Sequence, residues 1–148
     1  MPTDYEAMNT GLLLYLPYRY AEERVFTALA EQGHRVTAAQ ARVFQRIGSH
    51  GSRLVDLAEA TSLTKQSVGF LVDQLERAGL VSREADPSDA RARLVTITAR
   101  GQELIADGVP ILAEVEGEWR DLLGEEEYAR LRQALVRLSA HSDRHTER

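Results

Sequence analysis

Apolar residues recur every three or four positions along most of the chain, which is the spacing of one helix face. Between residues 80 and 98 they alternate with polar residues instead, which is typical of strands. The pattern predicts the order α-α-α-α-β-β-α-α and a mainly α (α+β) fold. The helices are expected over residues 9–30, 38–47, 54–60, 64–78, 98–123 and from 124 onwards, and the strands over 80–84 and 93–98.

Local signals at the expected helix ends agree with this pattern. Thr37 and Gln40 have the spacing of a capping box, in which each side chain accepts a backbone hydrogen bond at the start of the helix. Thr64 is a favourable N-cap for the fourth helix, and Gly79 suits the position just after its end. The chain therefore specifies where these helices begin and end.

Proline and glycine residues predict irregularities in two of the expected helices, those over residues 9–30 and 98–123. Pro17 is expected to kink the first helix, because proline removes a backbone donor and clashes one turn back. Gly108 and Pro110 are expected to interrupt the helix over residues 98–123. Between the strands, residues 86–89 (Asp-Pro-Ser-Asp) supply turn chemistry.

Composition excludes several classes of function. The chain has 148 residues and no cysteine, so disulfides, cysteine nucleophiles and thiolate zinc sites are excluded. The apolar run over residues 12–16 is too short for the hydrophobic part of a signal peptide, and no segment is expected to span a membrane, so a cytoplasmic location is the default expectation. His141 and His145 have metal-ligand spacing but no third ligand, so no metal is expected. We find no catalytic motif and expect no cofactor.

The net charge of −5 conceals an uneven distribution. Residues 35–100 carry ten lysines and arginines against seven acids, whereas the flanking segments carry eight against sixteen. A mildly basic middle within an acidic frame suits a module that contacts phosphates.

The segment from Leu54 to Leu80 has the features of a helix-turn-helix. Ala58 is small enough for two helices to cross closely, Thr64 caps the second helix, and Val68 can pack back onto the first. Ser62 stands in the turn where glycine is commonest. Short helix pairs also occur in other all-α proteins, so the following hairpin decides the interpretation.

That hairpin completes a resemblance to a known family. The runs LVDQLERAGLV and DPSDARARLVTITARG, with the helix start TAAQARVF before them, resemble the MarR family of winged helix-turn-helix transcriptional regulators. The resemblance implies a single MarR-type domain over residues 1–148, with a winged helix-turn-helix lobe over 35–100. It also implies a homodimer on a palindromic operator, in which the helices of 1–34 and 101–148 form the subunit interface.

The same resemblance places Asp89 and Arg91 on the family's wing-tip Asp-x-Arg. An arginine on a narrow hairpin tip is attracted to the negative potential of the minor groove, and a nearby carboxylate can hold its guanidinium extended. Many members carry another arginine where this chain has Ala90, and Arg93 is a candidate to compensate.

On the recognition helix, Gln66, Phe70, Asp73 and Arg77 are expected to face away from the core. We expect Asp73 to pair with Arg77, four residues later. The full set of expected DNA-binding residues is Arg53, Thr64, Lys65, Gln66, Ser67, Gly69, Phe70, Gln74, Arg77, Asp89, Arg91 and Arg93.

Phe70 leaves two alternatives open. An outward phenylalanine either packs against the wing or a neighbouring helix, or contacts the methyl group of a thymine in the major groove. Phe70 and Gln74 replace residues that are often basic in the family, so no operator sequence can be carried over.

The first helix carries Tyr15, Pro17, Tyr18 and Arg19, which either line a pocket for a small aromatic effector or pack at the dimer interface. The function that the sequence predicts is a DNA-binding regulator, most simply a repressor, and not an enzyme. The alternative is a winged-helix protein-interaction module that does not bind DNA.

Overall fold

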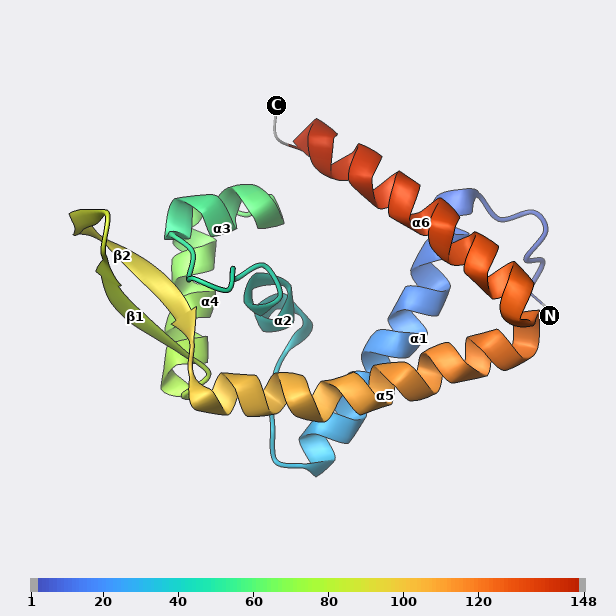
Figure 1. The fold of residues 1–148 in the computed structure, drawn as a ribbon, viewed down its shortest axis with the longest axis horizontal. Helices are drawn as coiled ribbons and strands as arrows, with labels where there is room; N and C mark the ends of the chain where they lie inside the picture. The colour runs from blue at the N-terminus through green and yellow to red at the C-terminus, as the bar shows by residue number, and fades with distance from the viewer. Residues whose placement is uncertain (1–2, 147–148) are drawn as a thin grey trace.

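The structure is a computed structural model that describes residues 3–146, with side chains described as far as residue 142. Its elements follow the expected order, which confirms the mainly α fold with one small sheet (Figure 1). They are α1 (Thr10–Glu31), α2 (Ala38–Phe44), α3 (Leu54–Thr61), α4 (Lys65–Arg77), β1 (Val81–Asp86), β2 (Asp89–Ile97), α5 (Ala99–Leu123) and α6 (Glu125–Thr146).

Helices α2, α3 and α4 and the β1–β2 hairpin form a unit that we call the winged lobe. Its core draws apolar side chains from all three helices and both strands. Burying each such side chain contributes roughly 1.5–3 kcal/mol, so the core fixes how the three helices are arranged. The most deeply buried members are Val43, Leu57, Val68, Val72, Leu75, Val81 and Val95.

The hairpin is longer than its sequence predicts. Strands β1 and β2 pair antiparallel from Val81 with Ile97 up to Asp86 with Asp89, so only Pro87 and Ser88 form the turn. Both aspartates that we assigned to the turn therefore belong to strands: Asp86 is the last residue of β1 and Asp89 is the first residue of β2. A two-residue connection suffices to reverse an antiparallel pair.

Helix lengths also differ from expectation in two places. Helix α2 ends at Phe44, three residues early, and Ile47 then donates a backbone hydrogen bond to Phe44. Helix α5 is not interrupted: it runs through both Gly108 and Pro110. Gly108 is buried against α1, where a Cβ would lie 3.8 Å from Val25 Cγ1, so tertiary packing outweighs its low helix propensity.

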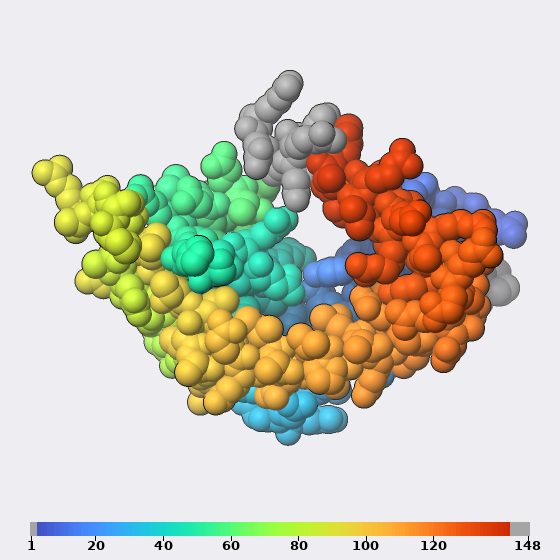
Figure 2. Space-filling view, in the orientation of Figure 1, coloured from blue at the N-terminus to red at the C-terminus, as the bar shows by residue number. Residues whose placement is uncertain are grey.

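The long helices lie beside the winged lobe (Figure 1). Helix α5 leads away from the hairpin and packs against α1, and an ion pair of 2.7 Å joins Glu118 Oε1 of α5 to Arg24 Nη1 of α1. Helix α6 packs mainly on α5 and turns back, and Figure 2 shows a hollow between α6 and the winged lobe. In the described part of the chain, none of the helices is both long and apolar enough to cross a membrane.

The winged lobe is joined tightly to α5. Thr98 caps α5 and its hydroxyl donates to the Gly79 carbonyl oxygen at 2.5 Å. Gly101 in the first turn is buried, and a Cβ there would overlap the Leu80 carbonyl oxygen and Ile97 Cγ2. Only glycine therefore allows α5 to approach the hairpin this closely.

Candidate nucleic-acid interface

The turn between α3 and α4 has the geometry of a helix-turn-helix. Ser62 adopts the left-handed conformation (φ 56°, ψ 28°), so a serine fills the position where glycine is commonest. Leu63 N–H donates to Ala58 O at 3.1 Å, and Thr64 Oγ1 accepts from Ser67 N–H at 3.1 Å. The Thr64 hydroxyl also donates to Ser67 Oγ at 2.8 Å, so both residues are engaged in starting α4.

Helix α4 has one buried face and one exposed face. Val68, Val72 and Leu75 have no exposed surface. Gln66 is exposed on the other side, and Phe70 is 58% exposed. The ring of Phe70 is therefore not buried against the wing or a helix, which favours the second of its two alternatives.

Gly69 lies beside Phe70 in the middle of α4. A Cβ at this position would meet nothing within 4 Å, and its φ is not in the left-handed region. Nothing in the described part of the chain therefore requires glycine here, although glycine lowers helix stability by roughly 0.5–1 kcal/mol relative to alanine.

Asp73 pairs with the wing and not with its own helix. Its Oδ1 lies 2.7 Å from Arg83 Nη2 of β1, and Glu76 Oε1 lies 3.1 Å from Arg83 Nη1. The predicted Asp73–Arg77 pair is therefore wrong, because a half-buried arginine facing α4 from the hairpin competes successfully for both acids. Arg77 is exposed at the end of α4.

Gln74 faces the interior of the lobe. It is half-buried, and its Oε1 accepts a hydrogen bond from Gln40 Nε2 of α2 at 3.0 Å. Lys65, by contrast, is exposed at the first turn of α4. The exposed face of α4 thus carries a basic residue at each end, while its two acids, Asp73 and Glu76, are paired with Arg83.

A bulge near the tip of the wing presents Arg91. Ala85 pairs with Arg93 and the next residue, Asp86, pairs with Asp89, so three residues of β2 have no partner on β1. Asp89 Oδ1 accepts from the backbone N–H of Arg91 at 3.0 Å, so it orders the chain at Arg91, whereas we expected it to hold the guanidinium. The side chains of Arg91 and Arg93 are both exposed.

Arg53 and Asp86 connect the start of α3 to the wing tip. Arg53 occupies the N-cap position of α3, and its Nε and Nη2 donate to Asp86 Oδ2 at 2.8 and 2.5 Å. Asp86 is 7% exposed, and its Oδ1 accepts from the hydroxyl and the N–H of Ser88. The Ser88 hydrogen bonds, with Arg53, lower the pKa of Asp86 to about 2. The turn prediction for Asp86 missed this contact, and the sequence analysis assigned no role to Arg83; the alternation of side chains along β1 places these two residues on opposite faces.

The comparisons with known proteins agree with this geometry. Residues 34–92 match the sequence model of the MarR family. The winged lobe is therefore similar to the MarR family over these residues. Over 77 residues the chain is 39% identical to the transcriptional regulator HosA of Escherichia coli O111:H-, covering 52% of this chain and 57% of HosA. The match therefore spans little more than half the length of that relative.

Solved MarR-type structures match nearly the whole chain. A crystal structure of MarR is 27% identical with a TM-score of 0.68, covering 93% of this chain and 99% of MarR. CouR from Rhodococcus jostii bound to p-coumaroyl-CoA is 26% identical with a TM-score of 0.66, covering 90% and 93%. A MepR mutant from S. aureus bound to an oligodeoxyribonucleotide is 23% identical with a TM-score of 0.59, covering 90% and 98%.

Outside the winged lobe, the long helices enclose an apolar groove of about 760 Å³, which we call the basal groove. Pro17 and Tyr18 line it, while Tyr15 is exposed and Arg19 forms an ion pair with Glu23 at 2.9 Å. The other apolar lining residues are Leu13, Leu14 and Ala21 of α1, Leu112, Trp119, Leu122 and Leu123 of α5, and Tyr128, Leu131, Leu135 and Leu138 of α6.

Tyr18 is the member of the expected ligand cluster that both lines the groove and has a polar partner. Its hydroxyl donates to Glu22 Oε1 at 3.0 Å, and partial burial followed by this hydrogen bond raises the pKa of Tyr18. The cluster of four residues is thus only partly brought together by the groove.

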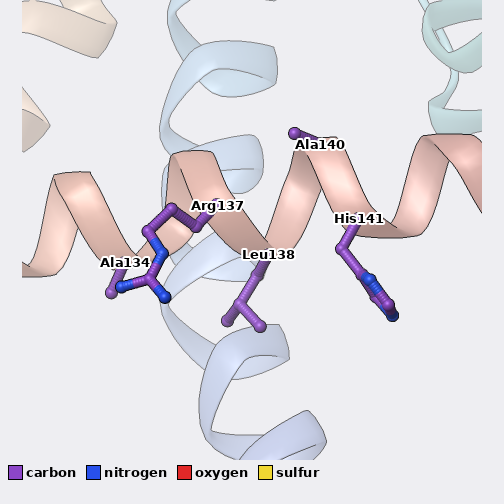
Figure 3. Close-up of a pocket in the computed structure, with 5 residues that line it drawn as sticks. All are labelled: Ala134, Arg137, Leu138, Ala140 and His141. Atoms are coloured by element: carbon purple, nitrogen blue, oxygen red, sulfur yellow. The ribbon is translucent and has the colours of Figure 1, made fainter.

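A second hollow lies along α6, toward its C-terminal end. Arg137, Leu138 and His141 extend to one side of the helix and Ala140 to the other (Figure 3). The side chain of His145 lies outside the described residues. Within the described residues, no three histidine or acidic side chains are grouped to hold a metal ion.

Proposed function

We propose that this protein is a homodimeric transcriptional regulator that binds double-stranded DNA at a palindromic operator and represses transcription. The observation that carries the proposal is the exposed face of α4, where Gln66, Gly69 and Phe70 are free of internal packing. The major groove admits such a helix, and its base edges are read by polar and apolar side chains.

The wing supports the same partner. Arg91 is presented on a bulge and Arg93 follows on the strand, which suits entry of a guanidinium into a narrow minor groove. Lys65 at the start of α4 is placed for a phosphate contact. A protein of this fold, MepR, has been solved with an oligodeoxyribonucleotide, which supports DNA as the partner.

The homodimer rests on the basal groove. Leu122 is 81% exposed and Leu112 and Leu138 are about half exposed, so one chain leaves a continuous apolar surface open to water. Such a surface is expected to be covered by a partner. A second copy of the chain fits, because its own terminal helices carry the complementary apolar residues and two copies would present two winged lobes to a palindrome.

The proposed effector is a small aromatic molecule. CouR, which shares this fold, was solved with an aromatic acyl-CoA, and the basal groove supplies Tyr18 and Trp119 beside aliphatic side chains. A ligand that favours a lobe spacing unlike that of the half-sites would lower DNA affinity by its differential binding energy.

Selection from random duplexes tests the function directly, followed by binding measurements over a range of salt. We expect a palindromic consensus and an affinity that falls steeply as salt rises, through counterion release. Arg91→Ala should weaken binding roughly 5- to 150-fold. A wild-type protein that enriches no sequence and shows no salt-dependent binding would instead be a protein-interaction module.

A further inference from the structure

Asp86 carries an unusual number of hydrogen bonds for a residue at a wing tip. It is the one charged residue that is buried among the side chains that the structure describes. One carboxylate oxygen accepts from the Ser88 hydroxyl at 2.7 Å and its N–H at 2.8 Å, and the other accepts twice from Arg53. Charge-assisted hydrogen bonds of this kind are stronger than neutral ones and fix orientation.

The hairpin is attached to residues 51–53, the segment just before α3, at two points along its length. Near its base, Ser52 and Val95 exchange backbone hydrogen bonds of 3.0 and 2.8 Å. Gly51 makes this approach possible, since a Cβ there would lie 2.9 Å from Thr96 Cγ2 and its φ is 87°. Near the tip, Arg53 holds Asp86. Residues 51–53 therefore fasten the hairpin to the start of α3 along its length.

The upper attachment lies directly beside the bulge that carries Arg91. Asp86 is paired with Asp89, the residue at which the bulge begins, and Asp89 in turn accepts from the N–H of Arg91. A chain of contacts thus runs from α3 through Arg53, Asp86 and Asp89 to Arg91. Without the upper attachment, the nearest contacts that tie the hairpin to the helices are the Ser52–Val95 hydrogen bonds and the ion pairs of Arg83, both further from the tip.

We propose that Arg53 and Asp86 form a latch that positions Arg91 for the minor groove. The proposal rests on the proposed function, because the DNA contact of Arg91 is itself part of it. Arg53, which the sequence suggested as a direct DNA contact, is then a positioning residue, since Nε and Nη2 of its guanidinium are engaged by Asp86.

For the DNA affinity of Asp86→Asn, the latch predicts a change opposite in sign to the one that net charge alone predicts. Asp86→Asn removes a negative charge from a DNA-facing lobe, which on charge alone should tighten DNA binding. Asparagine can still accept both Ser88 hydrogen bonds through its oxygen, but its amide nitrogen cannot accept from Arg53. If the latch positions Arg91, Asp86→Asn weakens binding despite the more favourable charge.

The experiment compares Asp86→Asn with Asp56→Asn in DNA affinity on the selected operator. Asp56 is exposed in the first turn of α3. The substitution Asp56→Asn therefore removes the same charge from the same lobe without changing a residue of the wing. We expect a 5- to 20-fold loss for Asp86→Asn and no loss for Asp56→Asn. Arg53→Gln, which breaks the latch from the other side, should match Asp86→Asn. Unchanged or tighter binding by Asp86→Asn overturns the proposal.

A second arm separates positioning from general destabilisation. In an Arg91→Ala background, Asp86→Asn should cost less than twofold further, because the residue that it positions is gone. Fully additive losses would show that Asp86 does not act through Arg91 and would overturn the proposal.

A third arm needs no DNA, so it distinguishes failure of the latch from failure of the proposed function. Amide hydrogen exchange of residues 88–92 should accelerate at least tenfold in Asp86→Asn but not in Asp56→Asn, while residues 81–83 keep their protection. Unchanged exchange at the tip would overturn the latch even if the protein binds DNA. A wild type that binds no DNA would refute the proposed function while leaving this arm able to confirm the Arg53–Asp86 attachment.

Discussion

Phe70 exposes a phenyl ring at the centre of the face that we propose enters the major groove. A ring in that position can contact a thymine methyl group, which the polar Gln66 side chain cannot do as well. Phe70→Ala should leave folding and dimerisation intact but weaken operator binding by about 1–3 kcal/mol, the usual cost of one lost base contact.

Replacing the facing thymine by uracil provides the control for this prediction. Uracil lacks only the methyl group, so the substitution should weaken the wild type and leave Phe70→Ala almost unaffected. Equal losses in the two proteins, or none in either, would refute the contact.

Gly69 is expected to lower the stability of the protein while it allows α4 to approach DNA more closely. Because a Cβ would meet nothing within 4 Å, Gly69→Ala should raise the free energy of unfolding by roughly 0.5–1 kcal/mol. The added methyl group would lie on the groove-facing side, so operator binding should weaken although the protein is more stable. Denaturant unfolding and DNA titration of the same variant check both parts; a stabilised variant with unchanged DNA binding would give Gly69 no role in recognition.

At the residue scale, the sequence was informative where helical periodicity decides the outcome. The exposure of Gln66 and Phe70 and the burial of Val68 follow from 100° per residue. The partner of Asp73 did not follow, because Arg83 reaches it from a strand ten residues later. Side-chain pairing between elements depends on tertiary placement, which a local ion-pair rule cannot supply.

Among the elements, the wing has a stability that depends on pH in a defined window. The pKa of Asp86 is lowered to about 2 in the folded protein, so its ionised form contributes stability above the ordinary value of 3.8. That contribution is lost as pH falls from about 4 through about 2. The difference in unfolding free energy between wild type and Asp86→Asn should therefore shrink over this range.

Chemical denaturation at pH 6, 4, 3 and 2 measures that difference. Asp56→Asn serves as the reference, because it removes the same charge from an exposed position in the first turn of α3. A wild-type advantage over Asp86→Asn that stays constant down to pH 2 would contradict the assignment.

Element boundaries were predictable where a cap marks them and not elsewhere. Thr37, Thr64 and Thr98 each accept a backbone hydrogen bond at a predicted helix start. The extent of the hairpin was underestimated because Asp86 and Asp89 have turn propensity but lie in the strand ladder. The predicted break in α5 at Gly108 failed because contact with α1 holds the helix together.

For the whole molecule, the predicted homodimer is testable through the basal groove. Leu131→Glu would place a charge among the apolar lining residues and should shift the protein to monomer in sedimentation experiments at micromolar concentration. Val55→Glu provides the matched control, because Val55 is exposed on α3 in the winged lobe. A wild type that sediments as a stable folded monomer would refute the dimer.

The unbroken α5 has a mechanical consequence. With 25 residues at about 1.5 Å of rise each, it is a rod about 37 Å long, clamped to the hairpin at one end by Thr98 and Gly101. A tilt of roughly 5° at the far end therefore carries the winged lobe by about 3 Å, close to the 3.4 Å rise of one base pair. Over this length, a tilt of α5 too small to disturb its packing displaces the winged lobe by about the distance between two successive base pairs.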